Sequence, residues 1–201
     1  MHDEPTDHYF STAPRADDRR RDVSAMIWGR EMTFTTSSGT FSHRGLDKAT
    51  EILLRASTPP TAGTLLDLGC GWGPIACSLA LAAPRAAVWA VDINQRALDL
   101  TGLNAERAGA RVHTALPDDV PATLVVDQIW SNPPIRIGKA ALHDLLMRWL
   151  PHLAPAGTAR LVVGKNLGAD SLQQWLIDQG WPTTRAGSEQ GFRLLEVSRG
   201  T

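Results

Sequence analysis

Short apolar runs alternate with longer segments of helical period along most of the chain. Apolar runs bounded by turn residues are typical of buried strands, whereas amphipathic helices need longer periodic segments. The alternation over residues 64–163 therefore predicts an α/β fold, a mostly parallel sheet with helices on both faces. The expected strands are 64–68, 87–91, 111–115, 125–130, 159–163, 183–185 and 193–198, and the expected helices are 46–55, 74–82, one from about 95, 139–150 and 169–179.

The N-terminal part divides into two stretches of different character. Residues 1–22 are polar, carry the run Arg19-Arg20-Arg21 between acidic residues, and are expected to form a mobile segment. Residues 23–36 predict two short strands that turn at Gly29-Arg30. We therefore expect a single domain over 23–201, in which a hairpin and helix (23–56) precede a core (64–201).

A Gly-rich turn joins the first core strand to a helix that opens with Pro74. Gly69, Gly71 and Gly73 lack a Cβ, so the backbone of this turn can approach a ligand closely. The spacing is G-x-G-x-G, not the G-x-G-x-x-G of dinucleotide-binding folds, and no hydride-transfer site is visible. A nicotinamide-dependent oxidoreductase is therefore disfavoured.

Two positions after the following strands fit a nucleoside. Asp92 ends the 87–91 strand, where an acid can accept hydrogen bonds from two ribose hydroxyls; it can equally cap the helix that begins near Gln95. Leu116 follows the next strand and can face an adenine ring, or lie in a solvated loop.

Asn132-Pro133-Pro134-Ile135 follows the apolar 125–130 run. Each proline fixes its own φ and restricts the residue before it, which sets the direction of the Asn132 side chain and the Pro133 carbonyl. Two acceptors held in this way suit the NH2 group of a nucleobase, a poor nucleophile that must be oriented toward an electrophile. Alternatively, the segment is only a turn after a strand.

Taken together, these motifs resemble the class I S-adenosylmethionine-dependent methyltransferases, with a Rossmann-like fold. The chain is most similar to the small-domain branch typified by small-subunit (16S) ribosomal RNA guanine N2-methyltransferases. The similarity spans residues from about 39 to 197, and its stretches are Gly39 to Ser42 with Leu46-Asp47, DLGCGWGP at 67–74, Asp92 to Asn94, SNPPIRIGK at 131–139, and Gly191 to Leu195.

The resemblance implies S-adenosylmethionine as cofactor, an antiparallel C-terminal edge of the sheet, and ribosomal RNA or the small ribosomal subunit as partner. It assigns the transfer step to Asn132, Pro133 and Pro134. Substrate contacts are expected from Phe41, Ile135, Arg136 and Lys139. The expected cofactor-binding residues are Asp67, Gly69, Cys70, Gly71, Gly73, Asp92, Ile93, Leu116 and Asn132.

The sequence departs from the family pattern at two points. Ile135 stands where an aromatic residue often stacks on the target base, so Phe41, Trp72 or Phe192 would have to supply that contact, although Phe192 fits a core position better. Ala49 stands two residues after Asp47, where related sequences tend to carry glycine.

Composition adds constraints on partners and location. The 201 residues are 43% hydrophobic, enough for one core, and the two cysteines and six histidines form no disulfide or metal pattern, so we expect no metal. No apolar stretch approaches the ~20 residues of a membrane span, so we expect no membrane association and a cytoplasmic protein. Larger relatives carry an additional N-terminal domain, and we expect a monomer or weak homodimer.

The net charge of −1 argues against RNA, whose binding depends on phosphate neutralisation. Arg136 and Lys139 follow the Asn-Pro-Pro turn, however, and local cations favour phosphate contact there. Other classes stay open: a methyltransferase acting on a protein glutamine, DNA adenine or a small molecule, or a non-catalytic module that binds cofactor or RNA. The glutamine and adenine enzymes usually prefer an aromatic residue after the prolines, so Ile135 disfavours them.

Overall fold

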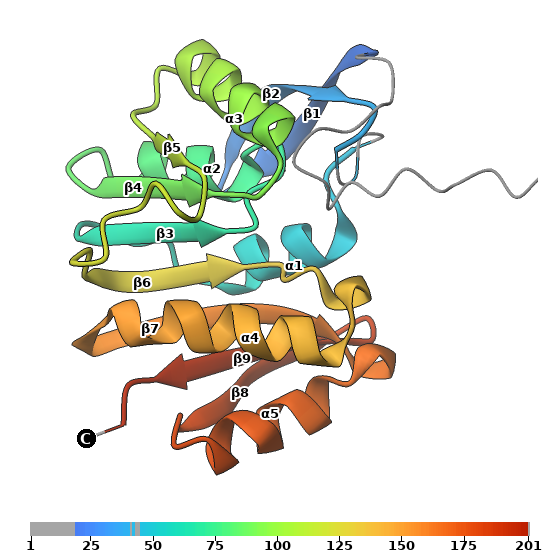
Figure 1. The fold of residues 1–201 in the computed structure, drawn as a ribbon. Helices are drawn as coiled ribbons and strands as arrows, with labels where there is room; N and C mark the ends of the chain where they lie inside the picture. Colours follow the sequence, from blue (N-terminus) through green and yellow to red (C-terminus); the bar gives the residue numbers. More distant parts are fainter. Residues whose placement is uncertain (1–18, 41, 43–44, 201) are drawn as a thin grey trace, which may run out of the picture.

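The computed structural model describes residues 19–40, 42 and 45–200, and it shows a central sheet covered by helices on both faces (Figure 1). The strands are β1 (Arg20–Ile27), β2 (Arg30–Ser37), β3 (Thr64–Leu68), β4 (Ala87–Val91), β5 (His113–Ala115), β6 (Val126–Ser131), β7 (Leu153–Gly164), β8 (Thr183–Glu189) and β9 (Phe192–Ser198). The α-helices are α1 (Lys48–Ala56), α2 (Pro74–Ala82), α3 (Gln95–Ala108), α4 (Lys139–Trp149) and α5 (Ala169–Asp178). Short 3-10 helices are η1 (Ile135–Ile137), η2 (Leu150–His152) and η3 (Lys165–Leu167).

The main sheet has seven strands in the order β5-β4-β3-β6-β7-β9-β8. Pairing is parallel from β5 to β7, and β9 runs antiparallel to both β7 and β8. The predicted fold class, with its antiparallel C-terminal edge, is therefore confirmed. The strand order reverses at β3, whose neighbours β4 and β6 belong to opposite halves of the sheet.

Two hydrophobic clusters cover the two faces of the sheet. One cluster contains the buried residues of α1, α2 and α3 together with those of the hairpin β1–β2, and the other contains those of α4 and α5. In β3, Leu65 belongs to the first cluster and Leu66 to the second, as the alternation of side chains along a strand requires. Figure 1 shows α4 and α5 in front of the sheet and α1 behind it.

The crossover between β5 and β6 contains no helix in the described part of the chain. Val120 and Leu124 of this connection pack against the α4–α5 cluster. Arg148 of α4 donates to the Pro117 carbonyl at 2.6 Å and pairs with Asp118 at 2.8 Å. His152 Nδ1 also lies 2.7 Å from the Leu124 carbonyl, so a loop held by several contacts takes the place of a covering helix.

Several boundaries differ from the sequence prediction. β1 begins at Arg20, because Arg20 pairs with Ser37 across the hairpin, so residues 20–22 belong to a strand rather than to the polar segment. β7 is longer than expected because both of its edges are paired, by β6 and by β9. β5 is shorter, as it is an edge strand that pairs over three residues. The division into a polar segment and a single domain otherwise stays a prediction.

A buried amide joins the hairpin to the Gly-rich turn. Asn104 of α3 accepts from the Thr35 backbone N–H at 2.7 Å, and its Nδ2 donates to the carbonyls of Thr35 at 2.9 Å and Trp72 at 2.8 Å. Two of these bonds satisfy the N–H and carbonyl of Thr35 on the outer edge of β2, the edge that does not face β1 and has no strand paired with it. Phe34 and Trp72 pack against each other in the same region, with ring centroids 5.1 Å apart.

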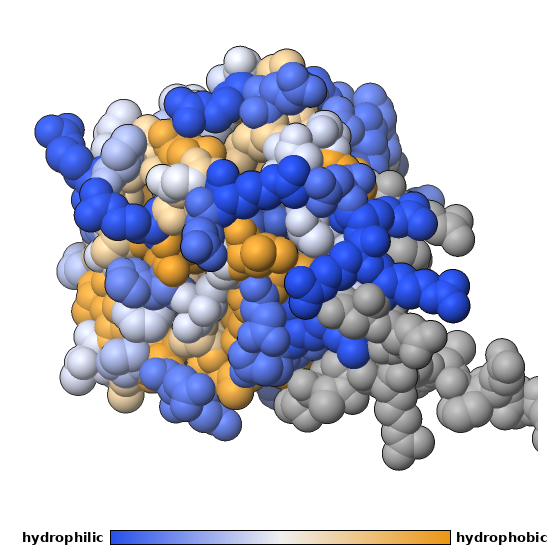
Figure 2. All heavy atoms as spheres, turned by 90° about the horizontal axis from the view of Figure 1, so that it is seen from above, coloured by the Kyte–Doolittle hydropathy of each residue, from blue (hydrophilic) through white to orange (hydrophobic). Residues whose placement is uncertain are grey.

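The outside of this region carries polar side chains together with some exposed apolar ones. Seen from above, the end of the molecule that carries α3 and the hairpin presents many hydrophilic side chains (Figure 2). Arg107 of α3 pairs there with Asp22 of β1 at 2.8 Å, but both side chains are about half exposed, so the pair contributes little to stability. The hairpin is attached mainly by its buried side chains and by Asn104.

Asn104→Ala should destabilise the protein by roughly 2–4 kcal/mol, because it leaves three backbone groups without their partners. Urea unfolding measures this free energy. Asp99→Ala, on the exposed side of the same helix, is the matched control and should change it by less than about 0.5 kcal/mol. Equal stabilities for the two variants would show that the hairpin does not depend on Asn104.

Candidate active site

The candidate site lies where β3, β4 and β6 end. Because these strands are parallel, their carboxyl ends meet at one edge of the sheet, at the point where the strand order reverses. Gly69, Asp92 and Asn132 each follow one of these strands. A Cβ built on Gly69 would lie 3.9 Å from the Pro134 ring, so the Gly-rich turn and the Asn-Pro-Pro turn are neighbours in space. The structure thus brings the three sequence motifs together.

The Gly-rich turn is fixed by hydrogen bonds to the end of β4. The N–H groups of Gly69 and Cys70 both donate to the Val91 carbonyl, at 2.8 and 3.1 Å, and Gly71 N–H donates to Asp92 Oδ2 at 2.9 Å. Gly69 and Gly71 have φ values of +76° and +58°, and residues that carry a side chain rarely adopt such backbone angles. Among the described residues, no atom lies within 4 Å of a Cβ built on Gly71, and Gly69 is exposed, so the backbone of both glycines is accessible to a ligand.

Three other residues assigned to the cofactor face inward instead. A Cβ on Gly73 would lie 2.8 Å from Thr101, so this glycine permits α2 to pack against α3. The Cys70 side chain is buried beside Thr101, and burial raises the pKa of its thiol. Asp67 is fully buried, and its Oδ2 accepts from the Ala76 N–H at 2.9 Å in the first turn of α2. Gly73, Cys70 and Asp67 thus support the turn from the inside and do not border the open space.

Asp67 has an unusual electrostatic environment. Burial raises the pKa of its carboxyl from 3.8 to about 8, and the nearby Asp92 adds to the effect, whereas the hydrogen bond from Ala76 opposes it. Its Oδ1 has no hydrogen-bond partner in the described part of the chain. A neutral carboxyl is therefore favoured at this position near pH 7.

Asp92 is placed as the sequence predicted, although it does not cap α3. Its two oxygens accept from the N–H groups of Gly71 and Asn94, both at 2.9 Å, and burial raises the pKa of its carboxyl. The helix cap is Asn94, whose Oδ1 accepts from the Arg96 N–H, so the alternative that Asp92 caps the helix is wrong. Ile93 is 40% exposed beside it, an apolar surface at the end of β4. Leu116 is half-buried after β5, the neighbour of β4.

Asn132 is held by two acceptors. Its Nδ2 donates to Asp47 Oδ2 at 2.9 Å and to Thr50 Oγ1 at 3.1 Å. Since a carboxylate accepts only, these bonds fix which side of the amide carries the nitrogen. The Oδ1 therefore points away from α1, and no donor among the described residues bonds to it.

The residues after Asn132 form a tight turn. The Ile135 N–H donates to the Pro133 carbonyl at 2.8 Å, and Pro134 has φ −74° and ψ 72°, the geometry of an inverse γ-turn. The Pro133 carbonyl thus keeps one lone pair for a ligand. Pro133 is buried, whereas Pro134 and Ile135 are half-buried.

The predicted substrate contacts have mixed outcomes. Lys139 is exposed at the first residue of α4, close to the turn. Phe41 and the side chain of Arg136 lie outside the described residues. Trp72 is only 2% exposed and packs on Phe34, so it cannot stack on a base, and Phe192 packs against the core as expected. Of the aromatic residues proposed from the sequence, the two that the structure describes, Trp72 and Phe192, thus do not supply the contact missing at Ile135.

The sequence reasoning missed the supporting roles of Asp47 and Thr50. Asp47 is the N-cap of α1, where its Oδ2 accepts from the N–H groups of Ala49 and Thr50 as well as from Asn132. An Asp before a helical segment is a recognisable cap signal, but its second role appears only when α1 packs beside the end of β6. Ala49 is buried at this helix start, where related sequences tend to carry glycine.

The loop before α1 is held on the other side of the site by α3. Asn94 Nδ2 donates to the Gly39 carbonyl at 3.1 Å, and Arg96 Nη1 donates to the Ser38 carbonyl at 3.0 Å. Gly39 is therefore held near the end of β4, and Asp47 near the end of β6. The segment between them contains Phe41, His43 and Arg44, which the structure does not describe.

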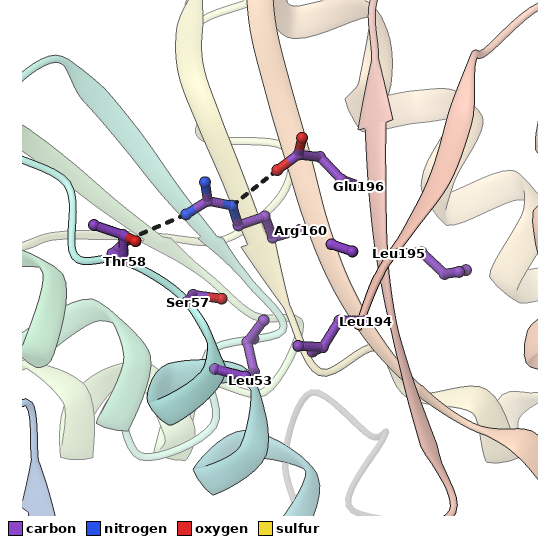
Figure 3. Close-up of a pocket in the computed structure, with 9 residues that line it drawn as sticks. Leu53, Ser57, Thr58, Arg160, Leu194, Leu195 and Glu196 are labelled. Carbon is purple, nitrogen blue, oxygen red and sulfur yellow. Dashed lines mark hydrogen bonds and ion pairs between the residues drawn. The ribbon is translucent and has the colours of Figure 1, made fainter. Parts of the chain in front are cut away.

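A separate cavity of about 140 Å³ lies between α1, β7, β8 and β9 (Figure 3). The two charged residues in its wall, Arg160 and Glu196, form an ion pair at 3.3 Å. Arg160 also donates to the Thr58 carbonyl at 3.3 Å. The Arg160 guanidinium also lies 4.9 Å from the centre of the Trp130 ring. These contacts account for Arg160 as a structural residue.

Within the described ranges, no α-helix has the length and apolar character needed to cross a bilayer.

The buried carboxyl generates a pH prediction. Between about pH 4 and pH 8 the unfolded chain has Asp67 ionised while the folded protein holds it neutral, so unfolding releases a proton and stability falls as pH rises. Asp67→Asn should remove this contribution, which has a slope of at most about 1.4 kcal/mol per pH unit. Urea unfolding from pH 5 to 8 measures it, with exposed Asp144→Asn as the control. A slope as steep in Asp67→Asn as in the native protein would contradict a neutral Asp67.

Comparison with known proteins gives one relative that matches over nearly its whole length and others that match over only part of theirs. The chain is 32% identical over 199 residues to the uncharacterized protein YbxB of Bacillus subtilis (strain 168), a match that covers 96% of this chain and 99% of that protein. It is 31% identical over 167 residues to a ribosomal RNA small subunit methyltransferase C of Pseudomonas entomophila (strain L48), covering 81% of this chain and 49% of the relative. The chain spans about a third to a half of the length of the curated rRNA methyltransferases that it matches.

Solved structures support the fold. A 16S rRNA N2 methyltransferase from T. Thermophilus in complex with AdoMet and guanosine matches with a TM-score of 0.78 at 22% identity, over 92% of this chain and 52% of that one. A methyltransferase from Pyrococcus furiosus matches with a TM-score of 0.63 at 20% identity, over 75% of this chain and 81% of that one.

A family model named for the methyltransferase small domain matches residues 31–196, most of the chain. This family is the one that the sequence motifs predicted, and S-adenosylmethionine is its methyl donor. The match includes the hairpin strand β2, the Gly-rich turn, the Asn-Pro-Pro turn and nearly all of β9. The chain belongs to the methyltransferase small domain family.

Proposed function

We propose that this protein transfers a methyl group from S-adenosylmethionine to an exocyclic amine, and that the acceptor is the N2 amine of a guanine in small-subunit ribosomal RNA. The observation that carries the proposal is the orientation of Asn132. Its amide nitrogen is bound by Asp47 and Thr50, which leaves its oxygen as an acceptor at the edge of the sheet, beside the Gly-rich turn.

The cofactor would be held by the ends of β3 and β4. Gly69 and Gly71 offer backbone next to open space, and Ile93 offers an exposed apolar side chain for an adenine ring. Asp92 accepts from the N–H groups of Gly71 and Asn94 and interacts with that of Ile93, and a carboxylate has about four lone-pair sites, so it can still accept from a ribose hydroxyl. When bound, S-adenosylmethionine supplies an electrophilic methyl group on its sulfonium.

The Asn-Pro-Pro turn would orient the amine. Asn132 Oδ1 accepts one N–H, and the remaining lone pair of the Pro133 carbonyl accepts the other. With both N–H bonds held, the nitrogen lone pair turns out of conjugation with the ring and toward the methyl group, and the developing positive charge on the amine meets two oxygen dipoles. This arrangement stabilises the transition state more than the planar ground state, and no strong base is needed.

The choice of ribosomal RNA rests on the names of relatives and on local charge. Several curated relatives carry the name ribosomal RNA small subunit methyltransferase C, but this chain matches only part of their length. Lys139 is exposed beside the turn, where a cation can contact a phosphate despite a net charge of −1.

Asn132→Ala should lower the single-turnover methylation rate by roughly 10²-fold or more, the scale of one lost preorganised electrostatic contact. Its affinity for S-adenosylmethionine, measured by calorimetry, should stay within a few-fold of the native value, because the cofactor is held mainly by other residues. A methylation rate close to the native rate would show that the segment is only a turn.

The substrate can be identified in a strain that lacks the gene. Mass spectrometry of nucleosides from its small-subunit rRNA should show the loss of one N2-methylguanosine, and expression of the native chain, but not of Asn132→Ala, should restore it. An unchanged set of rRNA methylations would reject rRNA as the substrate. Loss of a different methylated nucleoside would reject guanine N2 as the acceptor.

A further inference from the structure

A cavity of about 200 Å³ opens on the other side of the Asn-Pro-Pro turn, between α4 and the start of α5. Ile135, the residue directly after the turn, forms part of its wall. Most of the remaining wall is apolar, from Leu142, Val163, Leu167 and Leu172, and the polar side chains on it are Lys139, His143 and Ser171. Ser171 is already satisfied, since it donates to the Gly168 carbonyl at 2.9 Å.

The position of this cavity follows from the strand order. The Gly-rich turn follows β3, Asn132 follows β6, and Val163 lies near the end of β7, the next strand in the sheet. Adjacent strands are about 4.8 Å apart, which is less than the length of a purine with its exocyclic amine. A base whose amine is bound at Asn132 can therefore extend its ring away from the Gly-rich turn and into the cavity.

His143 brings an aromatic ring to the cavity wall. Its ring stacks on Trp175 of α5, with centroids 3.5 Å apart and planes inclined by only 8°. Stacking against a half-buried tryptophan from another helix fixes the orientation of the imidazole. The wall thus carries an ordered aromatic side chain in the same cavity as Ile135.

We propose that the ring system of the acceptor base lies in this cavity and that His143, held by Trp175, provides the aromatic contact that Ile135 does not. This assignment rests on the proposed function and names the residue that positions its substrate. Ile135 and the leucines supply apolar area, and Lys139 is the nearby cation for a phosphate of the same nucleotide. An aromatic side chain can stack on any nucleobase, so the polar groups at the Asn-Pro-Pro turn would have to select guanine.

The test measures nucleotide binding without methyl transfer. The full chain is saturated with S-adenosylhomocysteine, and binding of guanosine 5′-monophosphate, adenosine 5′-monophosphate and ribose 5-phosphate is measured by calorimetry and NMR. His143→Leu should weaken binding of guanosine 5′-monophosphate about tenfold, the scale of one lost base–aromatic stack, whereas His143→Phe should stay within about threefold. Ribose 5-phosphate should bind more weakly than either nucleotide and should not respond to His143→Leu.

The chain provides a matched control in a second His–Trp pair. His113 of β5 lies against Trp89 of β4, with centroids 5.3 Å apart, on strands away from the cavity. His113→Leu should leave nucleotide binding unchanged. In the native protein, guanosine 5′-monophosphate should shift the indole N–H resonance of Trp175 more than that of Trp89, which tests the site even where a variant folds poorly.

The outcomes separate this proposal from the proposed function. Equal nucleotide affinity in the native protein and His143→Leu, or a larger shift at Trp89 than at Trp175, would overturn the assignment, as would undetectable binding of both nucleotides. Binding of both nucleotides with the same dependence on residue 143 would support the cavity even if rRNA analysis rejected guanine N2 as the acceptor. Loss of N2-methylguanosine from rRNA together with no effect of His143→Leu would support the function and reject this site.

Discussion

The parallel pairing of β3 with both β4 and β6 is the constraint on which the site depends. It places the ends of three strands at one edge of the sheet, so residues 69, 92 and 132 become neighbours although they are far apart in the chain. The Val91 carbonyl strengthens this arrangement, because it binds two N–H groups of the Gly-rich turn. The turn and the end of β4 therefore form a single rigid unit.

Buried and half-buried polar groups connect the layers around this unit. Asp67 joins β3 to the first turn of α2, Asn104 joins α3 to the hairpin and to Trp72, and Asp47 joins α1 to Asn132. Each group satisfies backbone or side-chain partners that would otherwise be buried without hydrogen bonds. The motif residues thus divide into those that border open space, such as Gly69 and Gly71, and those that hold them in place.

The chemical environment changes in a clear order along the carboxyl ends of the strands. A carboxylate and an exposed isoleucine follow β4, uncovered backbone follows β3, and an amide oxygen follows β6. An apolar cavity with an aromatic side chain comes next, beside β7. This order suits a nucleoside, a transferable group and an acceptor base placed side by side.

Most of the elements and the identity of the motifs can be recognised from the order of amino acids alone. Apolar periodicity and turn residues depend on local preferences, so β3, β4 and α2 were predicted with the boundaries that the structure has. The sequence also placed Asp92 and Asn132 at strand ends. The length of β7 and the start of β1 were not predicted, because both depend on pairing with strands distant in the chain.

The roles of the individual motif residues depend on how the helices and strands pack together. Asp67, Cys70 and Gly73 belong to the Gly-rich motif, yet packing of α2 and α3 directs them inward. Asp47 and Thr50 fix the Asn132 amide, and His143 meets Trp175, through contacts between residues that lie far apart in the sequence. Local patterns specify which residues end a strand or begin a helix, whereas the direction of a side chain and its partners depend on how those elements pack.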